Sequence, residues 1–326
     1  MTYFVEHRWE QLKNSTKLRA NLEARAKLLS AIRKFFDERG YVEMETPLMV
    51  AKPGMEPYLD PFETTLTTPT GESHDAFLIT SPEYSLKKLV AAGFPRIYQL
   101  GKCFRNLEGS GGRHNPEFTM LEWYRTGTDY RGIMDETEEL FVTTGKAFGK
   151  EFSTPFERLT VEEAFQKFAG KSALELAPDE GEYHKVFLNE VEPKLGIERP
   201  TFLYDYPASM AALSRPAKDP RFAERFEMYV NGLELANTFS ELIDPAVQRA
   251  RFEQERAFRA RLGKTDIPID NELIAALAEM PETGGISVGV DRLLMLLVDA
   301  KDIREVIAFP TDSMFEKKIA RRGLSG

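Results

Sequence analysis

Residues 104–124 combine arginine, aromatic and acidic side chains at spacings that could bind a flat, charged ligand. The segment reads as a strand, a glycine-rich loop and a returning strand. A purely structural hairpin would more often carry Val, Ile or Leu on its buried face. Alternation along the returning strand instead places these four side chains on one face, near Arg105 of the first strand: Phe118, Met120, Glu122 and Tyr124.

A second hairpin brings two acids together. Asn231-Gly232 is typical of a two-residue type I′ turn, so Glu227 and Glu234 lie on one face as diagonal neighbours, about 7–8 Å apart. Carboxylates at this separation could share Mg²⁺ ions that also bind polyphosphate oxygens. Two solvated acids on an edge strand are the alternative.

Small residues line one face of the segment 285–293. Gly285, Ser287 and Gly289 alternate with larger residues and would let a ligand approach the strand closely, and Arg292 follows in the first turn of an apolar helix. Glycines that only allow tight sheet packing are the alternative.

Ser81-Pro82-Glu83 predicts the start of a helix that ends at Gly93, with Ser81 as the N-cap and Pro82 at the first position. Glu83 in the first turn has a structural explanation, since it complements the helix dipole.

These segments together resemble the class II aminoacyl-tRNA synthetases in their lysine-specific form. Residues 104–124 resemble motif 2, and residues 285–293 resemble motif 3. A predicted helix from Lys17 to Gly40 and a short strand at 41–45, closed by Thr46-Pro47, resemble motif 1. The resemblance implies an α+β fold, an antiparallel sheet flanked by helices, and a homodimer formed through motif 1.

The resemblance also sets the expected domain boundaries. Residues 17–312 form the catalytic domain, with a helical insertion at about 130–200 in which Thr160 and Glu163 make a capping box. Residues 1–16 are a polar extension, and residues 313–326 are a basic tail with Lys317, Lys318, Arg321 and Arg322. The arginine-rich helix 246–262 is interpreted as a solvated face.

The family chemistry is activation of a carboxylate by ATP, and the resemblance assigns roles to individual residues. Arg105 and Arg292 are the expected catalytic residues, and Glu227 and Glu234 are the expected Mg²⁺ ligands. The expected ATP-binding residues are Arg105, Asn106, Glu108, Arg113, His114, Phe118, Glu234, Leu235, Gly289 and Arg292. The expected amino-acid-binding residues are Ser81, Pro82, Glu83, Arg105, Glu122, Tyr124, Asn237, Phe239, Glu241 and Ser287.

The expected amino-acid pocket is rich in acids. Glu83, Glu122 and Glu241 would repel one another unless a cationic ligand compensates their charge, which favours a diamino acid such as lysine over neutral amino acids.

Three local departures from the family pattern affect these assignments. Leu107 is an extra residue in the motif 2 loop. Ser287 replaces the Gly or Ala usual at its position and would narrow the pocket floor, which could shift the preference from lysine towards (R)-β-lysine. Simple alternation sends Asn237, Phe239 and Glu241 to the face opposite Glu234, so a bulge is expected near Thr238, where Gly is usual.

Composition and charge exclude several classes of partner and environment. The chain has 326 residues, a net charge of -9 and one cysteine, so broad capture of nucleic acid and a disulfide framework are not expected. No signal core or run of 18 apolar residues occurs, which predicts a cytoplasmic protein without membrane association.

About 16 residues precede the motif 1 helix, too few for the anticodon-binding domain of a lysyl-tRNA synthetase. The chain is more similar to the stand-alone paralogues that ligate (R)-β-lysine to a lysine of elongation factor P, and tRNA is not expected as the main acceptor. A truncated synthetase acting on tRNA or another acceptor and a catalytically silent regulatory module are the alternatives.

Overall fold

The computed structural model describes residues 7–108, 111–211 and 213–315. The basic residues predicted in the C-terminal tail, Lys317, Lys318, Arg321 and Arg322, lie outside the described residues, as do Gly109 and Ser110 of the motif 2 loop.

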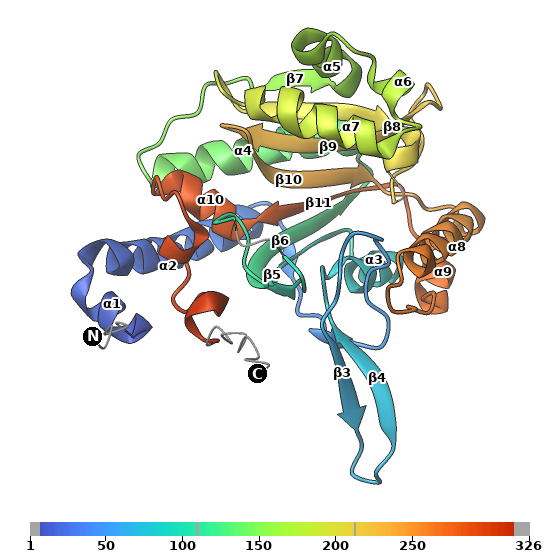
Figure 1. The fold of residues 1–326 in the computed structure, drawn as a ribbon, viewed down its shortest axis with the longest axis horizontal. Coiled ribbons are helices and arrows are strands. Elements are labelled where there is room, and N and C mark those ends of the chain that lie inside the picture. Colours follow the sequence, from blue (N-terminus) through green and yellow to red (C-terminus); the bar gives the residue numbers. More distant parts are fainter. Residues whose placement is uncertain (1–6, 109–110, 212, 316–326) are drawn as a thin grey trace, which may run out of the picture.

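A large mixed sheet forms the centre of the molecule (Figure 1). Neighbouring strands are antiparallel except for the edge pairs β1–β5 and β7–β8, which are parallel. This is the α+β architecture expected from the motifs. In spatial order the eight strands are β1 (Val42–Glu43), β5 (Arg96–Phe104), β6 (Glu117–Thr126), β11 (Thr283–Gly289), β10 (Leu233–Ser240), β9 (Phe222–Val230), β8 (Thr201–Pro207) and β7 (Glu157–Thr160).

Helices cover the sheet in three groups, each with its own apolar cluster. The first group packs on one face and comprises α2 (Thr16–Asp37), α4 (Tyr130–Ala147) and α10 (Val290–Leu297). The second comprises α3 (Glu83–Ala91), α8 (Pro245–Arg261) and α9 (Asn271–Leu277). The third covers β8 and β9 and comprises α5 (Val161–Ala169), α6 (Ala173–Leu176), α7 (Glu180–Val186) and the π-helix η1 (Phe187–Val191). The remaining short helices are α1 (Arg8–Asn14), η2 (Glu192–Lys194), η3 (Ala208–Met210), η4 (Ile303–Glu305) and η5 (Thr311–Ser313).

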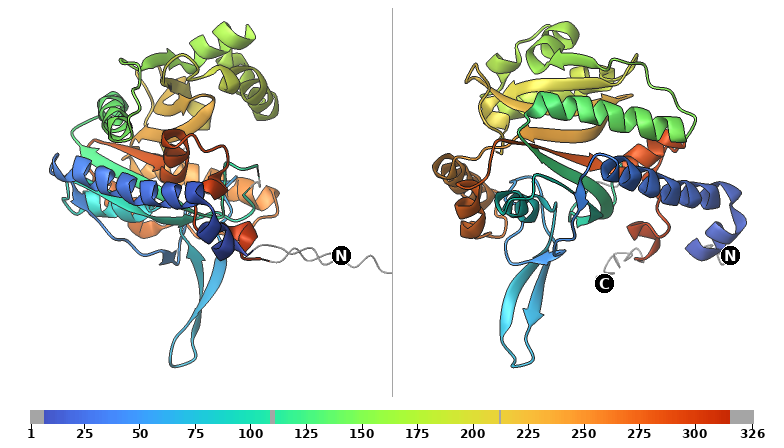
Figure 2. Two further views of the ribbon diagram at one scale, coloured as in Figure 1. Left: turned by 90° about the vertical axis from the view of Figure 1, so that its left-hand side faces the viewer. Right: turned by 180° about the vertical axis from the view of Figure 1, so that it is seen from behind.

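A smaller sheet of β2 (Met49–Val50), β4 (Ser73–Leu78) and β3 (Glu63–Thr67) stands beside the main one. Its β3–β4 hairpin extends away from the body of the molecule (Figure 2). Every residue of β3 is exposed, so this hairpin contributes little to the core.

Alternation along β6 separates a core face from an open face. Leu121 and Trp123 are fully buried against α2 and α4, whereas Glu122 and Tyr124 point to the opposite face. The predicted common face of Phe118, Met120, Glu122 and Tyr124 is therefore confirmed by the strand geometry.

Several local sequence signals form as expected. The Thr160 and Glu163 capping box begins α5, and Gly93 follows α3 with a positive φ of 100°. Pro82, rather than Ser81, is the N-cap of α3, although the Ser81 hydroxyl still accepts a hydrogen bond from the Glu83 amide at 3.0 Å. Strand β7 was not anticipated in the region interpreted as helices and turns.

Residues 7–16 contain more structure than the polar extension predicted for the start of the chain. Arg8 on α1 donates hydrogen bonds to the carbonyls of Ala308 (2.8 Å) and Ile307 (2.8 Å), about 300 positions away. These bonds connect α1 to the segment that follows η4.

The prediction that α8 has a purely solvated arginine face is wrong for two residues. Arg259 is 1% exposed and donates to the carbonyls of Glu56 (3.1 Å) and Leu59 (2.9 Å). Arg251 donates to the carbonyls of Ala211 and Ser214. Charge spacing could not identify these bonds, because their acceptors are backbone carbonyls of distant loops.

No helix among the described residues is long and apolar enough to cross a membrane.

A buried ion pair connects motifs 1, 2 and 3. Asp291 at the start of α10 accepts hydrogen bonds from Arg25 on α2 (2.6 Å) and from the Thr119 amide on β6 (2.6 Å). Arg25 also donates to the Thr119 hydroxyl at 2.5 Å. Asp291 is 2% exposed, so each of these bonds forms in a medium where an unpaired charge is costly.

We predict that Asp291→Ala lowers the free energy of unfolding by about 3–5 kcal/mol, because it leaves the Arg25 guanidinium and an amide unpaired. Urea unfolding measures the change. Asp135→Ala is the control, since Asp135 pairs with Arg158 at the surface and should change stability by less than about 1 kcal/mol. Equal losses in the two variants would contradict this account.

Candidate active site

The open face of the sheet carries a cavity of about 300 Å³ where β6, β10 and β11 meet the start of α10. Most of the expected nucleotide ligands gather here. The predicted site residues that line it are Arg105, Glu108, Arg113, His114, Phe118, Glu234, Leu235, Asn237, Ser287, Gly289 and Arg292.

Arg105 and Phe118 sit together on this surface. The Arg105 guanidinium lies over the Phe118 ring at 5.1 Å from its centroid. The Nε of Arg105 is buried and has no hydrogen-bond acceptor among the described residues. An unpaired guanidinium donor beside an aromatic plate is suited to an anionic group attached to a flat ring.

Arg292 is held at the opposite side of the cavity by the motif 2 loop and β10. It donates to the carbonyls of Glu234 (2.9 Å) and Arg113 (3.4 Å), and it contacts Nε2 of His114. Burial, followed by the positive charge of Arg292, lowers the pKa of His114. His114 Nδ1 lies 3.1 Å from the Glu108 carboxylate. The cavity is therefore bordered by guanidinium groups on two sides.

Asn106 is the predicted nucleotide ligand that does not line this cavity. It is exposed, and its side-chain oxygen accepts a hydrogen bond from the Leu107 amide at 2.9 Å. Leu107, the extra loop residue, has a positive φ of 57° and is 81% exposed. The chain accommodates the extra residue by a left-handed turn into solvent.

The predicted hairpin at Asn231-Gly232 forms with Val230 opposite Leu233 and Tyr229 opposite Glu234. Glu227 is two residues before Tyr229, so it is the expected diagonal neighbour of Glu234. The bulge is present, but it lies between Glu234 and Ala236 rather than near Thr238. Leu235, 2% exposed, belongs to the apolar cluster beneath the sheet. The bulge brings Asn237 to the same face as Glu234.

Glu227 and Glu234 differ in how many of their carboxylate lone pairs remain free to bind a metal ion. Glu227 accepts from the hydroxyls of Tyr206 (2.7 Å) and Tyr229 and from the guanidinium of Arg225. Glu234 faces the cavity with 38% of its side chain exposed, 3.5 Å from Arg292. Burial and then the charge of Glu227 raise the pKa of Glu234.

A carboxylate offers about four lone-pair sites, of which Glu227 has used three. The described residues contain no group of three or more His, Cys, Asp or Glu side chains that could hold a metal. Two carboxylates could supply only some of the six ligands of a Mg²⁺ ion, and phosphate oxygens and water would have to supply the others, as is usual for this ion.

Three of the expected amino-acid ligands form a buried acidic cluster next to the cavity. Glu83, Glu122 and Glu241 are 8%, 3% and 2% exposed. Tyr124 donates its hydroxyl to Glu122 at 2.8 Å. Burial and then Glu83 raise the pKa of Glu122 to about 8. Burial raises the pKa of Glu241 to about 8, against the opposing effect of Lys87.

The protein itself supplies one cation to these acids, in addition to the cationic ligand predicted from the sequence. Lys87 is 2% exposed and lies 2.5 Å from Glu83 and 2.6 Å from Glu241. Burial alone would lower the pKa of Lys87, but attraction to the two carboxylates raises it overall, so it stays protonated. One lysine compensates part of the acidic charge, and the rest is open to a ligand.

Strand β11 forms the floor between the two regions. Ser287 lies opposite Asn237 on β10 and Glu122 on β6. At Gly285 a Cβ would collide with the Glu241 carboxylate and the Tyr124 ring. The small face of this strand therefore admits the acidic cluster, in addition to any ligand above it.

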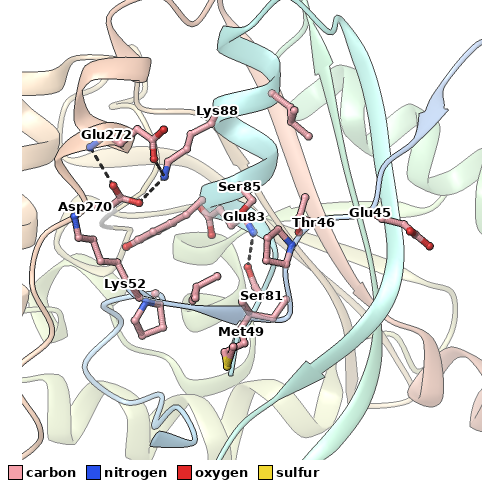
Figure 3. A pocket seen from close by; sticks show the side chains of 18 of the residues that line it. Glu45, Thr46, Met49, Lys52, Ser81, Glu83, Ser85, Lys88, Asp270 and Glu272 are labelled. Atoms are coloured by element: carbon pink, nitrogen blue, oxygen red, sulfur yellow. Dashed lines mark hydrogen bonds and ion pairs between the residues drawn. The ribbon is translucent and has the colours of Figure 1, made fainter. Parts of the chain in front are cut away.

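A larger cavity of about 570 Å³ is lined by Glu83 as well (Figure 3). Ser81, Glu83 and Glu56 line it together with residues of the motif 1 segment. At its rim Lys88 bridges Asp270 and Glu272, each at 2.7 Å (Figure 3).

Sequence analysis missed Lys87, Arg225 and Glu56. Lys87 follows Glu83 at the i,i+4 spacing of a helical ion pair, so it could have been found. Arg225 precedes Glu227 by two residues on the same strand face, and its guanidinium binds Asn237 at 3.2 Å and covers the Tyr206 ring. Glu56 lies in a loop whose path no local pattern predicts.

Comparison with known proteins agrees with these observations. The family described as tRNA synthetases class II (D, K and N) matches residues 1–313. Proteins named elongation factor P–(R)-β-lysine ligase are similar over most of the chain. The one from Proteus mirabilis is 42% identical over 309 residues, covering 89% of this chain and 95% of the relative. The one from Vibrio cholerae is 44% identical over 319 residues, covering 89% and 95%.

The raised pKa of Glu122 generates a prediction about stability and pH. A carboxyl whose pKa rises on folding, from 4.5 to about 8, binds more protons in the folded state. Its contribution is fully present below about pH 4.5 and is lost as the pH rises through about 8. Glu122→Gln should therefore make the fall in unfolding free energy between pH 5 and 8 shallower, by up to about 1.4 kcal/mol per pH unit.

Urea unfolding of the ligand-free protein across this pH range measures the effect. Glu72→Gln is the control, because Glu72 is exposed in the β3–β4 hairpin. Parallel pH profiles for Glu122→Gln and the unaltered protein would show that Glu122 is ionised throughout.

Proposed function

Because the chain belongs to the class II tRNA synthetases of the D, K and N group, we propose that it activates (R)-β-lysine, or lysine, with ATP and transfers it to the ε-amino group of a lysine of elongation factor P. The observation that carries this proposal is the juxtaposition of a guanidinium-lined cavity with a buried, incompletely compensated acidic cluster. The names of the similar proteins described above support the acceptor.

Arg105 is the proposed catalytic clamp. Attack of a carboxylate oxygen on the α-phosphate brings two anions together, and a planar guanidinium can donate to both. Its unpaired Nε and its position over the Phe118 ring suit this role. The products of this step are the aminoacyl-adenylate and pyrophosphate.

Phe118 and Arg292 are the proposed binding surfaces for adenine, and Glu108, Arg113 and His114 are the proposed partners of the remaining nucleotide groups. Mg²⁺ at Glu227 and Glu234 would neutralise charge on the departing pyrophosphate. Arg225 keeps Glu227 oriented, because it binds that carboxylate and Asn237 together.

The acidic cluster is proposed to select the amino acid. Glu122, Glu241 and Tyr124 would bind the distal ammonium group, and Glu83 would lie near the amino group closest to the carboxylate. A neutral amino acid would leave Glu122 without a cation and Lys87 as the one described ion-pair partner of Glu83 and Glu241. A buried group left unsatisfied in this way costs about 1–3 kcal/mol.

We further propose that residues 17–312 act as a homodimer through α2 and β1. β1 is an edge strand of the main sheet. The exposed apolar side chains near it are Val42, Leu48 and Met49. An unpaired edge with apolar side chains is suited to a second copy.

Because the proposed acceptor acts in translation, the proposed compartment is the cytoplasm.

The decisive experiment is incubation with ATP, Mg²⁺, (R)-β-lysine and elongation factor P, followed by intact mass of the acceptor. We expect the acceptor to gain one lysyl residue, and we expect bulk tRNA in a parallel reaction to stay uncharged. Charging of tRNA without modification of the protein would refute the proposed acceptor.

Arg105→Lys should reduce ATP–pyrophosphate exchange by roughly 10²–10³-fold, because lysine keeps the positive charge but lacks the planar, forked donor group of arginine. Arg221→Lys, at an exposed site, is the control.

A second prediction concerns Ser287, whose side chain narrows the floor between Asn237 and Glu122. Ser287→Gly should raise kcat/KM for lysine relative to (R)-β-lysine by several-fold, because removal of the side chain enlarges the pocket by about the volume of one methylene group. Exchange kinetics with the two isomers measure the ratio. An unchanged ratio would exclude Ser287 as a determinant of this choice.

A further inference from the structure

Glu56 belongs to a loop that is fixed at several points, so the position of its carboxyl group is determined by the fold. The buried Arg259 of α8 donates to its carbonyl at 3.1 Å and to that of Leu59 at 2.9 Å. The Met55 amide donates to the Tyr84 hydroxyl at 3.3 Å, and Met55 is 1% exposed. Farther along the loop, the Asn106 amide donates to the Asp60 carbonyl at 2.7 Å.

The carboxyl group of Glu56 is directed inward. Oε2 is buried and has no hydrogen-bond partner among the described residues. It lies against Gly54, where a Cβ would collide with it. A buried carboxylate oxygen without a donor costs free energy, and glutamate on an ordinary surface loop would turn into water instead. The fold therefore maintains an unsatisfied carboxyl oxygen at this point.

Glu56 shares a cavity of about 570 Å³ with Glu83, which is one of the expected amino-acid ligands. After burial, Glu83 raises the pKa of Glu56, whereas a hydrogen bond from its own backbone, followed by the charges of Arg105 and Lys87, lowers it. Burial, Glu56 and Glu83 likewise raise the pKa of Glu255 on α8 to about 8. Because Glu83 is proposed to lie near the amino group closest to the substrate carboxylate, Glu56 lies towards the same end of the substrate.

Lys87 does not neutralise the Glu56 carboxylate by a direct ion pair. It forms ion pairs with Glu83 and Glu241, and no ion pair between Lys87 and Glu56 occurs in the described structure. A further buried oxygen, Oε1 of Glu241, has no hydrogen-bond donor within the described ranges, whereas Oε2 of Glu241 is paired with Lys87. Unpaired acceptors thus occur both at Glu56, in the cavity lined by Glu83, and at Glu241 in the acidic cluster, which matches a ligand with two ammonium groups.

Resting on the proposed function, we propose that Glu56 is a further specificity residue: its carboxylate binds the ammonium group nearest the reacting carboxylate, together with Glu83, and so distinguishes diamino acids from acids that carry only the distal amine. Arg259 acts as a positioning residue, since it holds the Glu56 backbone.

The test compares two ligands that differ only in that ammonium group. ATP–pyrophosphate exchange gives KM for (R)-β-lysine, and competition gives the inhibition constant of 6-aminohexanoate, which has the distal amine alone. Glu56→Gln keeps the size of the side chain and removes its charge. We expect KM for (R)-β-lysine to rise by about 10- to 100-fold, the usual effect of one charge-assisted hydrogen bond. The inhibition constant of 6-aminohexanoate should stay unchanged.

Two further variants, together with exchange measured on the unaltered protein, make the result interpretable. Glu56→Asp retains the charge and should recover most of the lost affinity, and it carries the test if Glu56→Gln unfolds. Glu72→Gln, on the exposed hairpin, should leave both constants unchanged. An unchanged KM in Glu56→Gln, or an equal loss for both ligands, would overturn the assignment of Glu56 and leave the proposed function intact. Absence of exchange with every diamino acid in the unaltered protein would instead overturn the proposed function and this assignment with it.

Discussion

The compensation of buried negative charge is the constraint on which the site depends. Three glutamates lie at the open face of the sheet, and within the part of the chain that the structure describes Lys87 pairs with two of them, Glu83 and Glu241. Full compensation would leave nothing for a ligand to contribute, and no compensation would force protons onto the acids. The pKa values of about 8 for Glu122 and Glu241 mean that both acids largely carry a proton at neutral pH in the ligand-free protein. In the proposed complex, the ammonium groups of the ligand would stabilise the ionised carboxylates and displace these protons.

The sheet makes this arrangement possible because the two faces of a single strand lie in different environments, the apolar core on one side and the site on the other. Leu121 and Trp123 of β6 enter the apolar core, and the residue between them, Glu122, enters the site. The same alternation on β10 would have failed without the bulge after Glu234, which restores Asn237 to the site face. Local irregularity in one strand is therefore what joins the nucleotide side to the amino-acid side.

The sequence predicted the parts that depend on local spacing, namely the three motif segments, the hairpin at Asn231-Gly232 and the common face of β6. It misplaced the bulge, because the extra residue is decided by how Leu235 enters the core rather than by the residue type at Thr238. It also missed contacts made across the chain. Arg259 is 200 or more positions from the carbonyls it binds, so no pattern within α8 distinguishes it from its solvated neighbours.

Charge also gives the proposed site a direction. Arg105 and Arg292 line the cavity, where carboxylates accompany them, and the acids Glu122 and Glu241 are buried next to it. A molecule with an anionic head and a cationic tail would bind there in one orientation, because the reverse orientation would place its ammonium group against the guanidinium groups and its carboxylate against the buried acids, in a medium of low dielectric constant. In the proposed reaction, that orientation presents the carboxylate to Arg105, where negative charge develops during attack on a phosphate. The separation of charge that is proposed to select the substrate would therefore also align its reacting atom, so that binding and catalysis would draw on a single electrostatic gradient.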